Sequence, residues 1–249
     1  MASNPEPDIP PIVKGQNYSI TQLHNPSPGA KTIVDIVFVH GLTGNAYSTW
    51  LHKSTNVHWP SMLLKNNIPD ARILTFGYDA DIVNWWSQAS NNRVGNHADN
   101  LLGALVRLRE DTESEERKII FVAHSLGGLV TEMAIGLSRR SPFEYIRRIE
   151  THTVGIVFLG TPHFGADAAK WGSYGANLIG IVRQTNSPIV KVLRPDSEML
   201  ASIQRDFQGV LRQRIDERTA IDITCFFEEL PVRLVGEVGK DLLSCQHYS

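Results

Sequence analysis

The sequence predicts an α/β domain built on a mostly parallel sheet with helices on both faces. Short apolar runs alternate along the chain with longer amphipathic stretches at helical spacing, and this alternation is typical of parallel strand–helix–strand units. The chain has 249 residues, 42% of them hydrophobic, which suffices for one large core. We therefore expect one domain over residues 18–238, preceded by a disordered lead-in at 1–17 and followed by an atypical tail at 239–249.

The expected strands are short, and most are apolar enough to be buried on both faces. The first, residues 18–23, alternates along its length and is therefore expected at an edge of the sheet, before a break rich in proline and glycine. Apolar runs typical of buried strands occupy residues 35–39, 71–78, 119–122, 154–159 and 221–227.

The expected helices lie between these strands. Helical segments are predicted at residues 59–64, 96–109, 126–137 and 196–215. The charged segment 111–117 is expected to be a surface loop. Residues 166–193 combine apolar stretches with scattered glycines, and we expect them to form a lid or cap over a site.

Composition and charge narrow the classes of function. A net charge of −2 and a pI near 6.5 give no electrostatic basis for binding nucleic acid. Cys225 and Cys245 form neither a metal-binding nor a disulfide pattern, so we expect no metal, no cofactor and a reducing compartment. The start of the chain does not resemble a secretory signal, and no apolar run is long enough to span a bilayer. An intracellular, cytoplasmic protein is the resulting expectation.

The segment that carries the chemistry joins a predicted strand to a predicted helix. Between residues 119–122 and the helix lies Ala123-His124-Ser125-Leu126-Gly127, a nucleophile-elbow pattern with alanine in place of its first glycine. Such a turn forces Ser125 into a strained conformation and requires small residues two positions away on each side, as Ala123 and Gly127 are. We expect the Ser125 hydroxyl to be raised above the sheet, at a helix N-terminus that favours negative charge. The alternative is a flexible turn with a helix cap.

A nucleophilic serine also needs hydrogen-bond donors for the oxyanion that it creates. The strand at 35–39 ends in His40-Gly41-Leu42, and such a turn can aim the Leu42 N–H at the same point as the N–H of Leu126. We predict that these two amides form the oxyanion hole and that His40 and Gly41 support it. The alternative is that the segment simply ends a strand.

The acid of a catalytic triad is expected after a later strand. Glu228 and Glu229 follow the strand at 221–227, and we predict that Glu228 orients the base. Two adjacent carboxylates can also be a solvated strand end, and which of the two faces the site is left open. Asp222 lies too early in the strand and is expected at the surface.

The base of the triad is expected to be a histidine. In α/β hydrolases the triad residues follow one another along the chain as nucleophile, acid and histidine. Of the nine histidines, only His247 lies after Glu228. Its neighbours are typical of a tail, and a terminal histidine is more often frayed than catalytic. His163 is expected to be a structural or lid residue, and His124 to pack or hydrogen-bond beneath the site.

Four motifs together resemble one known family. They are Phe38-Val39-His40-Gly41-Leu42, the segment 121–130 around Ser125, Phe158-Leu159-Gly160-Thr161-Pro162-His163 and Phe226-Phe227-Glu228-Glu229. This combination resembles the serine-active-site-containing lipase-like proteins, which are α/β hydrolases of a serine esterase group. It is also similar to the hydrolase domain at the N-terminus of many fungal NLR-type signalling proteins. The resemblance covers residues 18–238.

The resemblance implies an α/β-hydrolase fold and a serine esterase or lipase activity with Ser125 as the nucleophile. It implies an ester or lipid substrate and contact with a membrane surface, since animal members of the family are associated with mitochondria and the endoplasmic reticulum. Members of the family continue past the acid with a further strand and a histidine-bearing segment. Residues 239–249 differ from that pattern, so the fold is expected to be truncated at its last strand.

Two hypotheses about function result. The first is an intracellular serine hydrolase that cleaves a carboxylic ester, with Ser125, Glu228 and His247 as the triad. The second is a catalytically impaired hydrolase-fold module that serves in signalling or scaffolding. The elbow and the His40-Gly41 turn favour the first hypothesis, whereas the departure at 239–249 favours the second.

Overall fold

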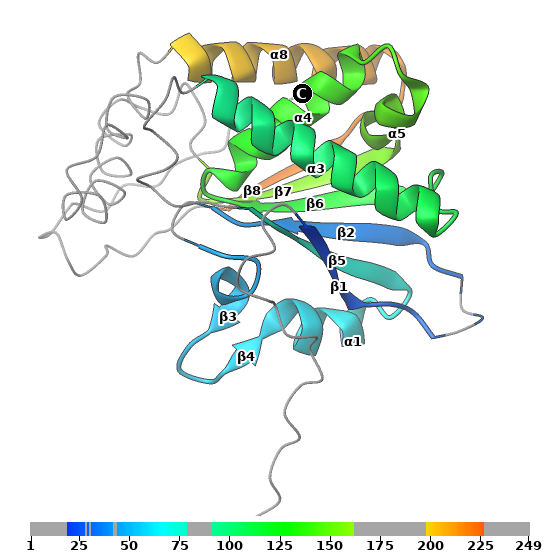
Figure 1. Cartoon of the computed structure of the whole chain (residues 1–249), viewed down its shortest axis with the longest axis vertical. Helices are drawn as coiled ribbons and strands as arrows, with labels where there is room; N and C mark the ends of the chain where they lie inside the picture. Colours follow the sequence, from blue (N-terminus) through cyan, green and yellow to red (C-terminus); the bar gives the residue numbers. More distant parts are fainter. Residues whose placement is uncertain are drawn as a thin grey trace, which may run out of the picture.

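A twisted, mostly parallel sheet lies at the centre of the computed structural model (Figure 1). The structure describes residues 19–27, 29, 31–41, 44–78, 91–161 and 198–226. Within this part of the chain the sheet has six strands in the order β1-β5-β2-β6-β7-β8. Their bounds are Ser19–His24 (β1), Val34–Val39 (β2), Ala71–Gly77 (β5), Lys118–His124 (β6), Thr153–Leu159 (β7) and Asp222–Phe226 (β8). The predicted lead-in, lid and tail at 1–17, 166–193 and 239–249 lie outside the described residues.

The register of the sheet brings the ends of four strands to one level. Only β1 runs antiparallel to its neighbour, and the other described pairs are parallel. Val39 pairs with Ala123, His124 with Leu159, and Leu159 in turn with Phe226. The carboxyl ends of β2, β6, β7 and β8 therefore lie side by side at one edge of the sheet, where sites of parallel sheets form.

One face of the sheet carries the larger core. It is covered by α3 (Asn91–Asp111), α4 (Gly127–Arg140), α5 (Glu144–His152) and α8 (Glu198–Asp216), which lie above the strands in Figure 1. Buried residues of these helices pack on the apolar side chains of the strands, among them Leu101, Leu105, Val130, Ile203 and Phe207. The helices at 96–109, 126–137 and 196–215 were predicted from their periodicity. The helix α5, on which no prediction was made, has a short apolar face and several charges.

A smaller layer covers the opposite face beneath β2 and β5 (Figure 1). It consists of η1 (Ser48–Trp50), the hairpin of β3 (Leu51–His52) and β4 (Val57–His58), the helical turn η2 (Pro60–Leu64) and α1 (Lys65–Asn67). Phe38 meets Trp50 and Trp59 edge to face, with ring centroids 4.9 and 5.0 Å apart. Layers thus lie on both faces of the sheet, as predicted for an α/β-hydrolase fold, and the hairpin is an addition that the sequence did not indicate.

A buried ionic cluster lies at the amino end of β2. Asp35 is fully buried, and its carboxylate accepts hydrogen bonds from Arg72 at 2.8 Å, Arg109 at 2.6 Å and Arg117 at 2.9 Å. Ser114 is buried beside it and accepts from Arg72 at 2.9 Å. The prediction of a surface loop at 111–117 was therefore wrong in part, because Arg117 reaches Asp35 and Ser114 is buried against Arg72.

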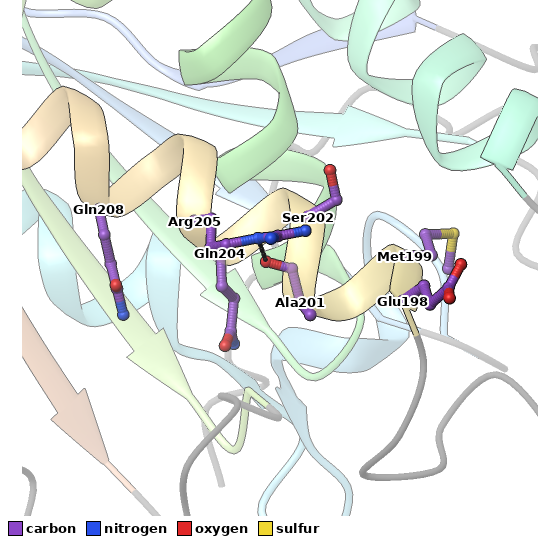
Figure 2. A pocket seen from close by; sticks show the side chains of 7 residues that line it. All are labelled: Glu198, Met199, Ala201, Ser202, Gln204, Arg205 and Gln208. Carbon is purple, nitrogen blue, oxygen red and sulfur yellow. Dashed lines mark hydrogen bonds between the residues drawn. The ribbon is translucent and has the colours of Figure 1, made fainter.

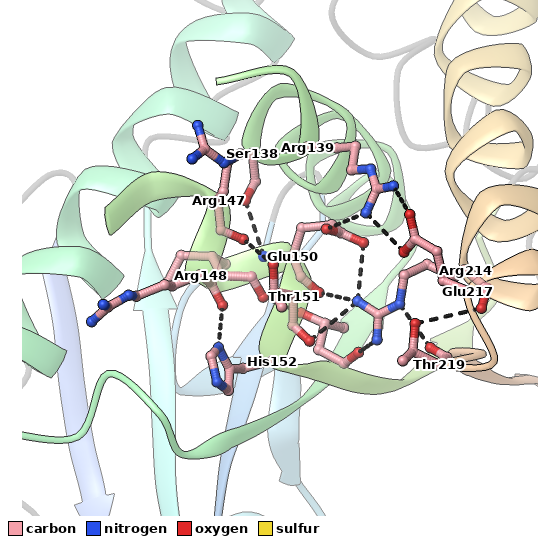
Figure 3. A network of polar contacts seen from close by, with 12 residues as sticks. Ser138, Arg139, Arg147, Arg148, Glu150, Thr151, His152, Arg214, Glu217 and Thr219 are labelled. Atoms are coloured by element: carbon pink, nitrogen blue, oxygen red, sulfur yellow. Dashed lines mark hydrogen bonds and ion pairs between the residues drawn. The ribbon is translucent and has the colours of Figure 1, made fainter. Parts of the chain in front are cut away.

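A second network fixes α8 to the sheet (Figure 3). Arg214 near the end of α8 is buried and forms an ion pair with Glu150 of α5 at 3.0 Å. The same guanidinium donates to the carbonyl oxygens of Glu150 at 2.7 Å and Thr153 at 3.1 Å. Arg139 of α4 joins the network through Glu150 at 3.3 Å and through Glu217. One arginine thus holds three elements in a fixed relation.

Candidate active site

The turn between β6 and α4 has the strained geometry predicted for a nucleophile elbow. β6 ends at His124 and α4 begins at Gly127. Ser125 between them has φ +53°, in the left-handed region that a serine rarely adopts. Its N–H donates to the Leu159 carbonyl at 2.9 Å, and its own carbonyl accepts from the Gly128 N–H at 3.1 Å. Two strands and a helix therefore hold this conformation.

Gly127 is small because the backbone of β2 approaches it. A Cβ atom at this position would lie 2.4 Å from the His40 oxygen and 2.5 Å from the Val39 oxygen. Both distances are far below van der Waals contact, and backbone atoms have little freedom to yield. Glycine thus lets the start of α4 rest directly on the end of β2, which brings the elbow beside the next motif.

The turn that follows β2 packs against the nucleophile. A Cβ atom on Gly41 would lie 2.6 Å from the Ser125 Cβ and 2.7 Å from the His124 oxygen. Glycine at position 41 therefore allows the closest approach between the His40–Gly41 turn and the elbow. Leu42, predicted to donate the second oxyanion hydrogen bond, lies outside the described residues, and its role stays a prediction.

Ser125 is less exposed than the sequence suggested. The prediction was a hydroxyl raised above the sheet, but only 9% of the residue is accessible to solvent. The physical reason is the approach of Gly41, which covers one side of the serine. Gly41 thus covers part of the serine, and the direction of its hydroxyl stays a prediction.

The amide of Leu126 is in a position to act as a donor. The N–H groups of Ser125 and Gly128 both have backbone acceptors. Among the described residues no backbone carbonyl accepts from the Leu126 N–H. An amide next to a nucleophile, one residue before a helix and without a backbone acceptor in the described part of the chain, is the arrangement expected of an oxyanion donor.

His40 has both ring nitrogens engaged by its own surroundings. Nδ1 is 3.0 Å from the Gly41 oxygen, which can only accept, so Nδ1 carries the proton. Nε2 accepts from the Tyr78 N–H at 3.3 Å. Burial, together with a smaller effect of the nearby His124, lowers the pKa of His40 to about 4, against the opposing hydrogen bonds with the backbone. A neutral ring with both nitrogens occupied supports the turn and is unsuited to act as the base.

His124 lies beside the nucleophile but is held by packing. Its ring meets Trp50 edge to face, with centroids 6.2 Å apart. Its Nδ1 lies 3.2 Å from the position of a Cβ atom on Gly41. The side chain thus fills the space between η1 and the His40–Gly41 turn, on the side of the sheet where Trp50 packs.

The predicted acid and base lie outside the described residues. β8 ends at Phe226, so neither Glu228 nor Glu229 is described, nor are His163 and His247. Asp222 at the start of β8 is exposed, as predicted. No described histidine forms a hydrogen bond with the Ser125 hydroxyl. In the same part of the chain no group of three or more histidine, cysteine, aspartate or glutamate side chains is arranged to hold a metal ion.

An open hollow runs along the first turns of α8 (Figure 2). Its volume is about 730 Å³, and Ser125 is not among the residues that line it. The described residues that line it all belong to α8 and are Glu198, Met199, Ala201, Ser202, Gln204, Arg205 and Gln208. Among the described helices none is long and apolar enough to cross a membrane.

Solved structures similar to this chain include lipases and esterases. The mature form of lipase BlEst2 from Bacillus licheniformis is 21% identical, with a TM-score of 0.48, over 78% of this chain and 67% of that one. A lipase/esterase from Lactobacillus plantarum is 11% identical, with a TM-score of 0.43, over 84% of this chain and 86% of that one.

Comparison with curated proteins gives one kind of relative. Protein SERAC1 of zebrafish (Danio rerio) is 29% identical over 86% of this chain. The human protein of the same name is 25% identical over 83% of this chain. The chain spans about a third of the length of these relatives, 33% and 32%. Residues 33–202, more than half of the chain, match the family described as "Putative serine esterase (DUF676)". The chain belongs to this serine esterase family.

Proposed function

We propose that this chain is a serine hydrolase that cleaves a carboxylic ester with Ser125 as the nucleophile. The observation that carries the proposal is the strained Ser125, with φ +53°, packed against Gly41 and followed by the amide of Leu126, which has no backbone acceptor among the described residues. Strain of this size costs about 1–3 kcal/mol and persists only where the surroundings impose it. Membership of a serine esterase family supports the same reaction.

The proposed reaction has two stages. The Ser125 oxygen attacks the ester carbonyl carbon while its proton passes to a histidine, for which His247 is the candidate with Glu228 as its orienting acid. The N–H groups of Leu126 and Leu42 stabilise the oxyanion, and the histidine returns the proton to the departing alcohol. Water then attacks the acyl-enzyme in the same way, which releases the carboxylic acid and restores the serine.

We propose an ester of a lipid as the substrate. The motifs of the chain resemble those of lipase-like proteins, and the resemblance is also the support for a reaction at a membrane surface, with mitochondria and the endoplasmic reticulum as candidate locations. Hydrolysis of short-chain and long-chain p-nitrophenyl esters would compare the two substrate classes. A preference for the short chain would count against the lipid.

The proposal is tested by labelling with a fluorophosphonate probe, which forms a covalent bond with an activated serine. We expect wild-type protein to be labelled and Ser125→Ala to lose the label completely. Ser61→Ala is a matched control, because the buried Ser61 hydroxyl contacts His58 Nδ1 at 2.8 Å and so forms a serine–histidine pair away from the elbow. Labelling that disappears in Ser61→Ala and survives in Ser125→Ala would contradict the proposal.

The second candidate is a hydrolase-fold module without catalysis, used for signalling or scaffolding. It is supported by the sequence of residues 239–249, which does not resemble the histidine-bearing segment of the family. An unlabelled wild-type protein that is folded would support this candidate. If labelling occurs, its loss in His247→Ala would identify the base, whereas unchanged labelling would remove His247 from the mechanism. The pair Glu228→Gln and Glu229→Gln distinguishes the two carboxylates in the same way.

A further inference from the structure

Tyr78, directly after β5, reaches across to the end of β2. Its hydroxyl donates to the His40 carbonyl oxygen at 2.6 Å. Its backbone N–H donates to His40 Nε2 at 3.3 Å. The two rings stack with centroids 4.3 Å apart and an angle of 14° between their planes. One residue therefore contacts the backbone, the ring nitrogen and the ring face of His40.

His40, held in place by Tyr78, in turn restrains the position of Gly41. Its Nδ1–H donates to the Gly41 carbonyl at 3.0 Å, which ties the ring to the next peptide. Gly41 in turn packs against Ser125 with no room for a Cβ atom. Both rings are buried, at 0% exposure for His40 and 6% for Tyr78. Hydrogen bonds in such surroundings are costly to break, because the freed groups have no water to bind.

We propose that Tyr78 and His40 are positioning residues that hold the His40–Gly41 turn against the nucleophile. The catalytic consequence of this inference rests on the proposed function, since that turn precedes the amide predicted to hold the oxyanion. A displacement of the turn would weaken stabilisation of the transition state and leave substrate binding nearly unchanged. Tyr78 lies 47 residues before Ser125 in the sequence, and its role follows from the packing of β5 beside β2.

A second tyrosine–histidine stack offers a matched control. Tyr47 lies on His58 with ring centroids 4.4 Å apart and an angle of 6° between the planes. His58 is bonded to Ser61, in the layer beneath the sheet, and not to the His40–Gly41 turn. Tyr47→Phe therefore removes a hydroxyl from the same kind of stack without altering the proposed restraint.

The test compares Tyr78→Phe with Tyr47→Phe in two measurements. Amide hydrogen exchange of residues 37–41, followed by NMR, is expected to accelerate about 5- to 30-fold in Tyr78→Phe, as the loss of a buried hydrogen bond implies. The rate constant of fluorophosphonate labelling is expected to fall by roughly 10-fold with little change in the apparent affinity for the probe. Tyr47→Phe is expected to leave both values at the wild-type level.

The outcomes separate this inference from the proposed function. Unchanged exchange at 37–41 in folded Tyr78→Phe would overturn the inference, whatever the labelling shows. Accelerated exchange in a protein that the probe does not label would uphold the positioning role and contradict the catalytic proposal. Accelerated exchange with unchanged labelling in an active enzyme would also overturn the inference. The ¹⁵N NMR spectrum of the His40 ring gives a further test that needs only the wild-type protein. A proton on Nε2 in place of Nδ1 would also overturn the inference.

Discussion

The two ends of β2 carry buried polar groups of opposite character. At the amino end, Asp35 is an ionised group surrounded by the guanidinium groups of Arg72, Arg109 and Arg117. At the carboxyl end, His40 is an equally buried ring that burial keeps neutral, against the opposing effect of its hydrogen bonds with the backbone. The same strand thus has charge at one end and a titratable but uncharged group at the other.

The charged end serves the fold. Burial lowers the pKa of Arg109, with the neighbouring Arg72 and Arg117 acting in the same direction and Asp35 opposing them. The carboxylate of Asp35 thus compensates several positive charges at once, and it joins β2, β5, α3 and the loop before β6. Such a cluster contributes little net stability when complete but costs much when broken.

At the neutral, carboxyl end of β2, small residues allow close contact between two backbone segments. Gly41 and Gly127 bring the backbone of β2 and the elbow together, and Ser125 accepts a strained conformation. The amides of the elbow and the N-terminus of α4 supply partial positive charge at this edge. The comparison shows that ion pairs stabilise the sheet at the amino end of β2, where no chemistry is expected. At the carboxyl end, where the proposed reaction takes place, neutral hydrogen bonds and close backbone contacts determine the structure.

The largest effect is expected at the charged end. Asp35→Asn keeps the shape of the side chain but leaves the buried Arg72 and Arg109 without a counter-charge. Removing one partner of a buried ion pair costs about 3–5 kcal/mol, so the free energy of unfolding should fall by that amount. Urea denaturation followed by circular dichroism measures the change.

An exposed ion pair supplies the control for that variant. Arg140 and Asp206 are 2.8 Å apart, and both side chains are about half exposed. Asp206→Asn should cost less than about 1 kcal/mol, since solvent screens the pair. Equal losses in the two variants would show that the cluster at the amino end of β2 has no special role.

An effect of intermediate size on the free energy of unfolding is expected when the pH is lowered, because His40 lies buried at the carboxyl end of β2. The pKa of His40 is lowered to about 4 in the folded protein, from 6.5 in the unfolded chain. The unfolded state therefore binds the proton first, and stability declines as pH falls from about 6.5 to about 4, by at most about 1.4 kcal/mol per pH unit for one histidine. Urea midpoints measured at intervals across that range test the slope.

The contribution of His40 to the pH dependence of stability is measured by comparing wild type with His40→Asn. The stability difference between wild type and this variant should shrink as pH falls through the same interval, because the variant has no proton to gain at that position. His58, whose pKa burial also lowers to about 4, remains in both proteins and cancels. A difference that stays constant between pH 6.5 and 4 would contradict a neutral His40.

The sheet and its site motifs were predictable because they depend on local patterns. Buried strands show as short apolar runs, and the elbow shows as small residues around Ser125 at a strand–helix junction. The hairpin of β3 and β4 was missed since each strand has only two residues. The nine-residue helix α5 was missed because its apolar face is too short to show a clear period.

The partners of the motifs could not be predicted, since they are distant in the sequence. Asp35 appeared as part of an apolar run, and nothing near it indicates Arg72, Arg109 or Arg117. Tyr78 was identified only as the end of a strand, although it contacts His40 at three points. A charged residue within a buried strand is the signal that could have identified the cluster at Asp35.

The smallest effect concerns backbone strain, which occurs near both ends of β2. Glu113, in the loop that approaches Asp35, has φ +48°, and Ser125 has φ +53°. Glycine relieves such a conformation, so Glu113→Gly and Ser125→Gly should each raise the free energy of unfolding by about 1 kcal/mol. Only Ser125→Gly should abolish fluorophosphonate labelling, and Glu113→Gly should leave its rate unchanged. If Ser125→Gly were instead destabilising, the strain at the elbow would not be a cost to the fold, and the main structural argument for a functional serine would fail.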